Sequence, residues 1–112
     1  MKEGDVVLTP IPQAYGKSKN RPAILLREMP PYRDFLVCGV SSQLHQQVKD
    51  FDEIISPADA DFVVSGLLSE SLIRLGFLAV LPRSSVAGSI GTISPERHRR
   101  LLKTLSDYLV AS

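Results

Sequence analysis

Residues 22–43 read PAILLREMPPYRDFLVCGVSSQ, and this stretch decides the fold class. It contains an apolar run at 23–26 and a longer one at 35–40, on either side of a proline-rich turn at 29–32. Short runs of Val, Ile, Leu and Phe that are bounded by turn formers are typical of β-strands. The run at 35–40 is apolar at odd and even positions alike, which predicts a central strand buried on both faces.

Further short strands are predicted on both sides of this stretch. Their positions are 6–8, 52–55, 72–75, 77–81 and part of 85–93. Gly76 lies between two of these runs, where a β-bulge would join them into one strand. Residues 10–20 include two prolines and a glycine, and this composition predicts an ordered loop.

The C-terminal segment is predicted to be a helix. Ser94 is a good N-cap, Pro95 suits the first helical position, and Glu96 lies near the positive end of the helix dipole. The apolar stripe of this helix consists of Leu101, Leu102, Leu105, Tyr108 and Leu109. The basic residues predicted to occupy much of its remaining surface are Arg97, Arg99, Arg100 and Lys103. His98 is also predicted to be a surface residue.

Several short strands and one terminal helix predict a mainly β protein, in which a small, strongly bent sheet or barrel packs against the helix. The 112 residues contain no repeat, low-complexity tract or linker, so a single domain over residues 1–112 is expected. With 44% apolar and 22% charged residues, the composition is that of a globular protein. The single cysteine, Cys38, excludes an intramolecular disulfide and is expected to be a packing residue.

Neither a membrane protein nor a strongly basic one is indicated. The N-terminus lacks a charged-then-apolar leader, and no apolar run reaches the roughly 18 residues that cross a bilayer, so a cytoplasmic protein is expected. The net charge is +1, but basic residues gather in 1–27 and 73–103, whereas 50–70 is acidic. Two interpretations stay open: a solvated mixed surface, or a positive face built from both ends of the chain with the acidic segment elsewhere.

Most common catalytic constellations are absent from the sequence. His45 and His98 are far apart, no cluster of Cys, His or Asp has the spacing of metal ligands, and no glycine-rich loop follows a strand. The acidic residues at 50–53 lack the spacing of a calcium loop. No metal and no cofactor are therefore expected.

Two segments remain as candidates for binding or catalysis. In KSKNRP at 17–22, Pro22 fixes the backbone directly after Arg21, and arginine suits bidentate contacts to phosphate. In SSQ at 41–43, hydroxyls and an amide follow the central strand and can donate hydrogen bonds to a ligand. From spacing alone, an ordinary loop arginine and a simple strand-end cap remain the alternatives.

These segments and their order resemble the MazF/PemK family of toxin endoribonucleases. The resemblance is carried by GDVV at 4–7, NRPAILL at 20–26, VSSQ at 40–43, GLL at 66–68, LIRLG at 72–76 and IGTISPE at 90–96. It covers nearly the whole chain, and the ordered combination of motifs is more specific than any one of them.

The resemblance implies an SH3-like small β-barrel of the CcdB/PemK type with a C-terminal helix, assembled as a homodimer. It also implies a toxin that cleaves single-stranded RNA without a metal and is silenced by a cognate antitoxin over the substrate groove. Arg21 matches the family's catalytic arginine, Ser41 the hydroxyl of its Thr/Ser-x-Gln motif, and Arg74 an arginine that serves proton transfer or phosphate stabilisation. The residues expected to contact RNA beside them are Lys17, Lys19, Asn20, Ser42 and Gln43.

The implied reaction is attack of a ribose 2′-hydroxyl on the adjacent phosphorus, which leaves a 2′,3′-cyclic phosphate and a 5′-hydroxyl. Cations around the developing phosphorane would make a metal unnecessary. This chemistry requires Arg21 and Ser41 to line one solvent-open groove. Many family members carry acidic residues where this chain has Gly16 and Gly76, so no general base is visible.

This departure keeps two alternatives open. One is a non-catalytic toxin of the same fold that binds a protein target, as the related gyrase poisons do, and the other is a degenerate member that binds only RNA or an antitoxin. The loops at 12–20, 29–34 and 44–51 are expected to carry any RNA sequence preference. Leu67, Leu68 and Leu72 are expected either at a two-fold interface or in the core.

Overall fold

The computed structural model describes residues 1–12 and 18–111. Its strands form one antiparallel sheet of six strands in the order β4-β5-β3-β2-β1-β6. The strands are β1 (Asp5–Pro12), β2 (Ser18–Met29), β3 (Asp34–Ser41), β4 (Glu53–Ile55), β5 (Ser71–Leu81) and β6 (Gly88–Thr92). The helical segments are η1 (Leu44–Gln46), α1 (Phe62–Ser65), η2 (Arg83–Ser85) and α2 (Pro95–Val110).

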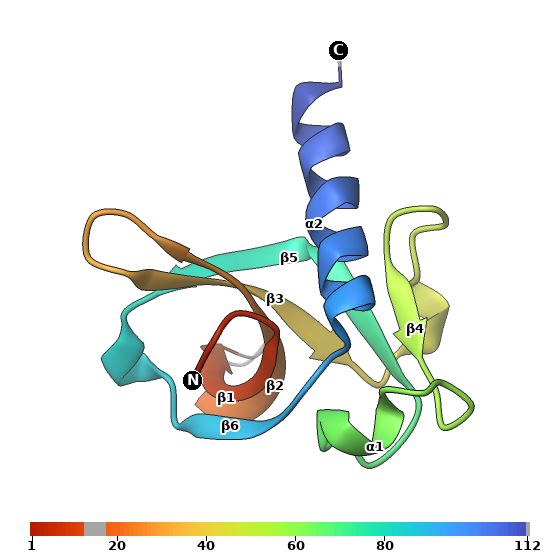
Figure 1. Ribbon diagram of the computed structural model, residues 1–112. Coiled ribbons are helices and arrows are strands. Elements are labelled where there is room, and N and C mark those ends of the chain that lie inside the picture. The colour runs from red at the N-terminus through yellow and green to blue at the C-terminus, as the bar shows by residue number, and fades with distance from the viewer. Residues whose placement is uncertain (13–17, 112) are drawn as a thin grey trace.

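The sheet is strongly curled. Figure 1 shows β1, β2 and β6 wound into a half-barrel at one side, with α2 standing across the sheet near β5. The predicted class, a mainly β small barrel with a C-terminal helix, is therefore confirmed. None of the helices in the described part of the chain is long and apolar enough to cross a membrane.

Both faces of the middle strands are buried, which explains their nearly continuous apolar sequences. On β2, Ile24 and Leu26 join a core cluster that includes Leu101 of α2, whereas Ala23 and Leu25 join a second cluster on the opposite face. Because successive side chains of a strand point to opposite faces, every side chain of a strand between two cores is buried, and apolar residues are favoured at every position. β3 lies inside the sheet between β2 and β5, as predicted.

The helix α2 begins where the sequence predicts. The Ser94 side chain accepts a hydrogen bond from the Arg97 backbone N–H at 3.1 Å, which caps the first turn. Leu101 and Leu105 are buried in the core, but Tyr108 and Leu109 are 66% and 69% exposed. Figure 1 shows the reason: the C-terminal end of α2 projects beyond the sheet.

Two residues of α2 were expected at the surface, and the structure corrects both. Arg97 is only 6% exposed and forms ion pairs with Glu53, Asp59 and Asp61. His98 is partly buried, with its Nε2 atom 2.8 Å from the carbonyl oxygen of Leu26. In both cases the partner comes from another part of the chain, which helix periodicity does not reveal. Part of the acidic segment thus neutralises the helix rather than lying elsewhere.

Residues 10–12 and 18–20 were expected in a loop, but the structure places them in strands. β1 continues to Pro12 and β2 begins at Ser18, and Pro10 pairs with Asn20. Among the residues that the structure describes, β6 pairs with β1 from Asp5 to Leu8, and no strand pairs with the far half of β1 on that edge, where proline is tolerated.

β5 is one strand with an irregularity at the predicted place. On β3, Cys38 pairs with Leu78 but its neighbour Gly39 pairs with Arg74, so β5 bulges around Gly76. Cys38 is fully buried, as expected of a packing residue, and this burial raises its pKa to about 12. A thiol in that environment is not a nucleophile at neutral pH.

Candidate functional site

An open groove of about 430 Å³ lies where β2 and β3 approach the loop between α1 and β5. Arg21 of β2 and Ser41 of β3 both line it, so the structure brings the two principal predicted residues together. The other lining residues are Leu8, Pro22, Val40, Ser42, Ile90 and, from the loop and the start of β5, Gly66, Leu67, Leu68, Ser69 and Ser71.

The strand register explains why Arg21 and Ser41 meet. Ala23 of β2 pairs with Gly39 of β3. Continuing that antiparallel register by two residues places Arg21 level with Ser41 and on the same face, because directly opposed residues of neighbouring strands share a face. Arg21 is exposed, and its own partner on β1 is Thr9, which is fully buried.

Ser41 is held as a hydrogen-bond donor to the groove. Its Oγ atom accepts a hydrogen bond from the Gln43 backbone N–H at 3.0 Å. Within residues 1–12 and 18–111, this hydroxyl donates to no other group of the protein. A hydroxyl with one lone pair already engaged and its proton available is oriented to donate to an incoming acceptor.

Arg74 lies close to this pair but does not line the groove. On β5, Arg74 pairs with Gly39 of β3, and Leu72 pairs with Ser41. Arg74 is therefore displaced from Ser41 by two residues along the strands, in the neighbouring row of side chains on the same face. Standard strand spacings put the Cα atom of Arg74 roughly 8 Å from that of Ser41 and roughly 12 Å from that of Arg21. Long arginine side chains on one face can converge on a phosphate across such a spacing.

The Phe77 ring packs against the Arg74 guanidinium. The Arg74 guanidinium carbon lies 5.6 Å from the centroid of the Phe77 ring, within cation–π range. The same ring covers Gly39, where an added Cβ would lie 2.8 Å from a ring carbon. A glycine at position 39 is therefore required for the ring to reach the sheet and support the arginine.

The predicted RNA contacts are placed as follows. Lys19 and Asn20 are exposed on β2, and Ser42 and Gln43 are exposed after β3. Lys17 and Gly16 lie outside the described residues. In the described part of the chain, no carboxylate or imidazole lines the groove, and no group of three His, Cys, Asp or Glu is placed to hold a metal ion.

The loop between α1 and β5 and the start of β5 supply groove residues that the sequence alone did not indicate, among them Ser69 and Ser71. Leu67 and Leu72 prove to be core residues, but Leu68 is 99% exposed and lines the groove. The GLL motif at 66–68 was the available signal: Gly66 has a φ of 75° and sits against β6, which turns the loop toward the groove.

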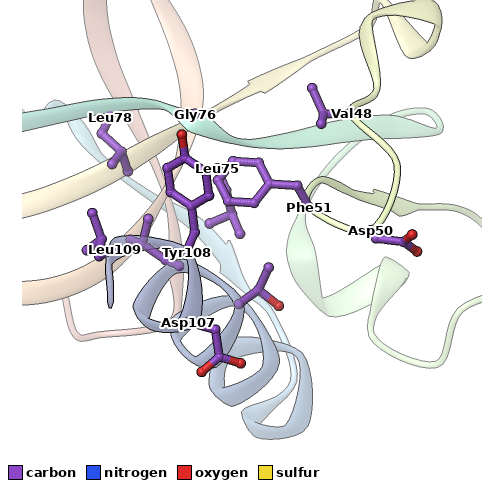
Figure 2. Close-up of a pocket in the computed structure, with 11 residues that line it drawn as sticks. Val48, Asp50, Phe51, Leu75, Gly76, Leu78, Asp107, Tyr108 and Leu109 are labelled. Carbon is purple, nitrogen blue, oxygen red and sulfur yellow. The ribbon is translucent and has the colours of Figure 1, made fainter. Parts of the chain in front are cut away.

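A second, larger pocket of about 800 Å³ lies near the end of α2. Figure 2 shows the rings of Phe51 and Tyr108 side by side in it, and their centroids are 5.1 Å apart. Leu75, Leu78 and Leu109 complete an apolar lining, while the carboxylates of Asp50 and Asp107 point away from the rings. This lining suits the docking of an apolar partner rather than catalysis.

Comparison with known proteins adds a family and a fold. A family model described as PemK-like, MazF-like toxin of type II toxin–antitoxin system matches residues 2–109. No curated protein sequence matches the chain significantly. Among solved structures, the Mycobacterium tuberculosis toxin MazF-mt6 superposes with a TM-score of 0.69 at 13% identity, over 96% of this chain and 98% of that one. At this identity the likeness is one of fold.

Proposed function

The chain belongs to the family of PemK-like and MazF-like toxins of type II toxin–antitoxin systems, and on that premise we propose that it is an endoribonuclease that cleaves single-stranded RNA without a metal ion. The observation that carries the proposal is that Arg21 and Ser41 line the same open groove. A guanidinium and a hydroxyl donor that line one groove suit the non-bridging oxygens of a phosphodiester.

In the proposed reaction, the 2′-oxygen of a ribose attacks the adjacent phosphorus and the bond to the 5′-oxygen breaks. Arg21 stabilises the negative charge that develops on the phosphorane, and Ser41 donates to one non-bridging oxygen. Arg74 supplies a second positive charge from the neighbouring row of the sheet. The 2′-hydroxyl loses its proton to water and the leaving 5′-oxygen gains one, which gives a 2′,3′-cyclic phosphate and a 5′-hydroxyl.

The RNA strand on either side of the cleaved bond is proposed to contact the exposed polar residues around the groove. These are Lys19, Asn20, Ser42 and Gln43. Lys17, which lies outside the described residues, is proposed as a further RNA contact from the sequence alone. Lysine contacts to phosphates release counterions, so RNA binding should weaken as salt is raised. Because the attacking group is the 2′-hydroxyl, DNA is not a substrate.

Cleavage of single-stranded RNA in EDTA tests the proposal. We expect cyclic-phosphate and 5′-hydroxyl ends, and a loss of about 100- to 1000-fold in rate for Arg21→Ala. Arg27→Ala is the matched control, because Arg27 lies on the same strand, is exposed, and pairs with Glu3 at 3.2 Å outside the groove. Intact RNA across varied sequences would contradict the proposal.

A non-catalytic toxin that binds a protein target is the second candidate. It is favoured by one observation: among the residues that the structure describes, no carboxylate or imidazole lines the groove. Growth arrest on expression of wild-type protein whose purified form leaves RNA intact would favour this candidate. Growth arrest that disappears with Arg21→Ala, together with cleavage in EDTA, favours the nuclease.

Two protein partners follow from the proposal. A cognate antitoxin is proposed to silence the toxin by covering the groove that Arg21 and Ser41 line. A second copy of the chain is proposed to dock on the apolar pocket at the end of α2. β4 pairs with β5 at Ser71–Ile73, and Asp52 accepts a hydrogen bond from the Leu75 backbone N–H at 3.0 Å. In the described part of the chain no strand pairs with this edge of β5 from Gly76 onward, and such a strand edge is self-complementary about a two-fold axis.

The proposed dimer interface differs from the one that the sequence offered around Leu67, Leu68 and Leu72. Leu67 and Leu72 are buried in the protomer and unavailable to a partner. The exposed apolar residues along the free part of β5 and the end of α2 take their place: Phe77, Leu78, Val80, Tyr108 and Leu109. We place the action of the toxin in the cytoplasm, where its proposed substrate is found.

A further inference from the structure

Leu68 is the most exposed large apolar side chain in the described part of the chain, at 99%, and it lines the groove that holds Arg21 and Ser41. The catalytic roles proposed above need charge and hydroxyl groups, and they make no use of an aliphatic side chain. A single exposed leucine is ordinary on a protein surface, but neighbouring apolar side chains that line a ligand groove fit an apolar part of that ligand.

The backbone around Leu68 is held firmly, so this exposure does not come from a loose loop. The Leu67 backbone N–H donates to the Oγ atom of Ser65 at 3.2 Å, and that hydroxyl donates to the carbonyl of Phe62. Leu67 itself is packed in the core. Because the Leu67 side chain points into the core, the side chain of Leu68 points outward into the groove.

Ile90 of β6 lies against the same loop and lines the same groove. An added Cβ at Gly66 would lie 2.1 Å from the Ile90 carbonyl oxygen and 3.3 Å from its Cβ atom, so only glycine allows the loop and β6 to approach this closely. Ile90 is 38% exposed. The groove therefore has an aliphatic side, formed by Leu68 and Ile90, in addition to the arginine and serines that line it.

A nucleotide has this same division, because it joins an anionic phosphate to a base with apolar faces. The groove volume of about 430 Å³ is within the range of sites for small organic ligands and leaves room for one such unit. On the premise of the proposed RNA substrate, we propose that Leu68 and Ile90 form the subsite for the base of the nucleotide whose phosphate is held by Arg21. Leu68 thereby contributes to the binding of a base at that position through its apolar face.

Binding of RNA that cannot be cleaved tests this subsite separately from catalysis. The probe is the tightest single-stranded binder from a randomised library of 2′-fluoro oligonucleotides, which lack the attacking hydroxyl, and binding is measured by fluorescence anisotropy. We expect Leu68→Ala to weaken binding about tenfold, near the lower end of the loss found when an aromatic side chain that stacks on a base is removed. Val63→Ala is the matched control, because Val63 is 85% exposed on the adjacent α1 but does not line the groove.

Replacing one base at a time by an abasic site identifies the base concerned. We expect one position at which the abasic site weakens binding to wild-type protein about tenfold but leaves binding to Leu68→Ala unchanged. Wild-type affinity in Leu68→Ala, the same abasic penalty in both proteins, or no binding of RNA at all would overturn the inference. If one abasic position distinguishes the two proteins but natural RNA is not cleaved, the nuclease proposal alone is overturned. If natural RNA is cleaved but no abasic position distinguishes the two proteins, the subsite alone is overturned.

Discussion

The Arg97 guanidinium donates hydrogen bonds to both carboxylate oxygens of Asp61, from Nε to Oδ2 at 2.8 Å and from Nη2 to Oδ1 at 3.2 Å. Asp61 also accepts a hydrogen bond from the backbone N–H of Ser94, the N-cap of α2. One buried carboxylate thus joins the start of the C-terminal helix to the segment that leads into α1. Since the loop that follows α1 forms one side of the groove, this ion pair helps to position part of the candidate site.

Removal of the arginine should destabilise the protein strongly. Arg97→Ala leaves the Asp61 carboxylate buried without its countercharge, which typically costs about 3–5 kcal/mol in the free energy of unfolding. Arg100→Ala is the control, because Arg100 pairs with Glu53 at an exposed position and should cost less than about 1 kcal/mol. Urea unfolding followed by circular dichroism measures both, and equal losses would contradict the assignment.

The same pair predicts how stability depends on pH. Burial alone would raise the pKa of Asp61, but hydrogen bonds to Arg97 and the Ser94 backbone N–H, together with the charge of Arg97, outweigh it and lower that pKa. The carboxylate therefore stays charged at lower pH in the folded chain than in the unfolded chain, where its pKa is about 3.9. Its stabilisation is complete above that value and is lost as the pH falls through the folded pKa.

Asp61→Asn tests this dependence, since it removes the titrating group. We expect the variant to be less stable than the wild type at pH 7 and to lose less stability between about pH 5 and pH 2. Thermal unfolding across that range provides the measurement. Parallel pH profiles for the two proteins would show that Asp61 makes no contribution.

Ser41→Ala should impair cleavage far more than folding. The substitution removes the donor proposed for a non-bridging oxygen, and the loss of one such donor typically costs about 100- to 1000-fold in rate. The Gln43 N–H that now loses its acceptor is exposed, so water can replace the hydroxyl. Single-turnover cleavage and thermal unfolding, measured on the same sample, separate the two effects; wild-type cleavage rates would remove Ser41 from the mechanism.

Leu109→Asp should break the proposed dimer without unfolding the protomer. Leu109 is 69% exposed and lines the apolar pocket, so a charge there is tolerated in the monomer but not in a covered interface. Light scattering should show a dimer for the wild type and a monomer for the variant. Val63→Asp, at an exposed position outside the pocket, should remain a dimer; a monomeric wild type at micromolar concentration contradicts the interface.

Thr9→Val should stabilise the protein by about 1 kcal/mol. Thr9 is fully buried, and its Oγ1 atom has no hydrogen-bond partner among the residues that the structure describes. Valine has the same shape without the hydroxyl, so the cost of leaving that group unsatisfied disappears. Thr9→Ser, which keeps the hydroxyl and loses the methyl group, should be destabilised instead; the melting temperatures of the two variants decide the matter.

Local sequence was sufficient for the elements whose stability depends on near neighbours. The run at 35–40 predicted a central strand because a strand between two cores needs apolar residues at every position. Ser94 and Pro95 predicted the start of α2 because capping acts within one turn. The bulge at Gly76 was likewise visible in the order of the residues.

Contacts between distant segments could not be obtained in this way. Arg97 and His98 were expected at the surface, since their partners, Asp61 and the Leu26 carbonyl, lie far away in the chain. The GLL motif marked the loop that contains Leu68 but did not show that Leu68 lines the groove, because alternation between core and surface does not tell which exposed residue borders a groove.

The sequence by itself determined the order of strands and helix, the family resemblance, and Arg21 and Ser41 as the residues to examine. Only the tertiary structure decided that the register of β2 and β3 puts Arg21 and Ser41 beside one groove. It also placed Arg74 two residues further along the neighbouring strand and Leu68 among the residues that line the groove. The physical reason is that residue types and their local spacing are properties of the chain. Strand register and the approach of a loop to a sheet depend instead on packing the whole core at once.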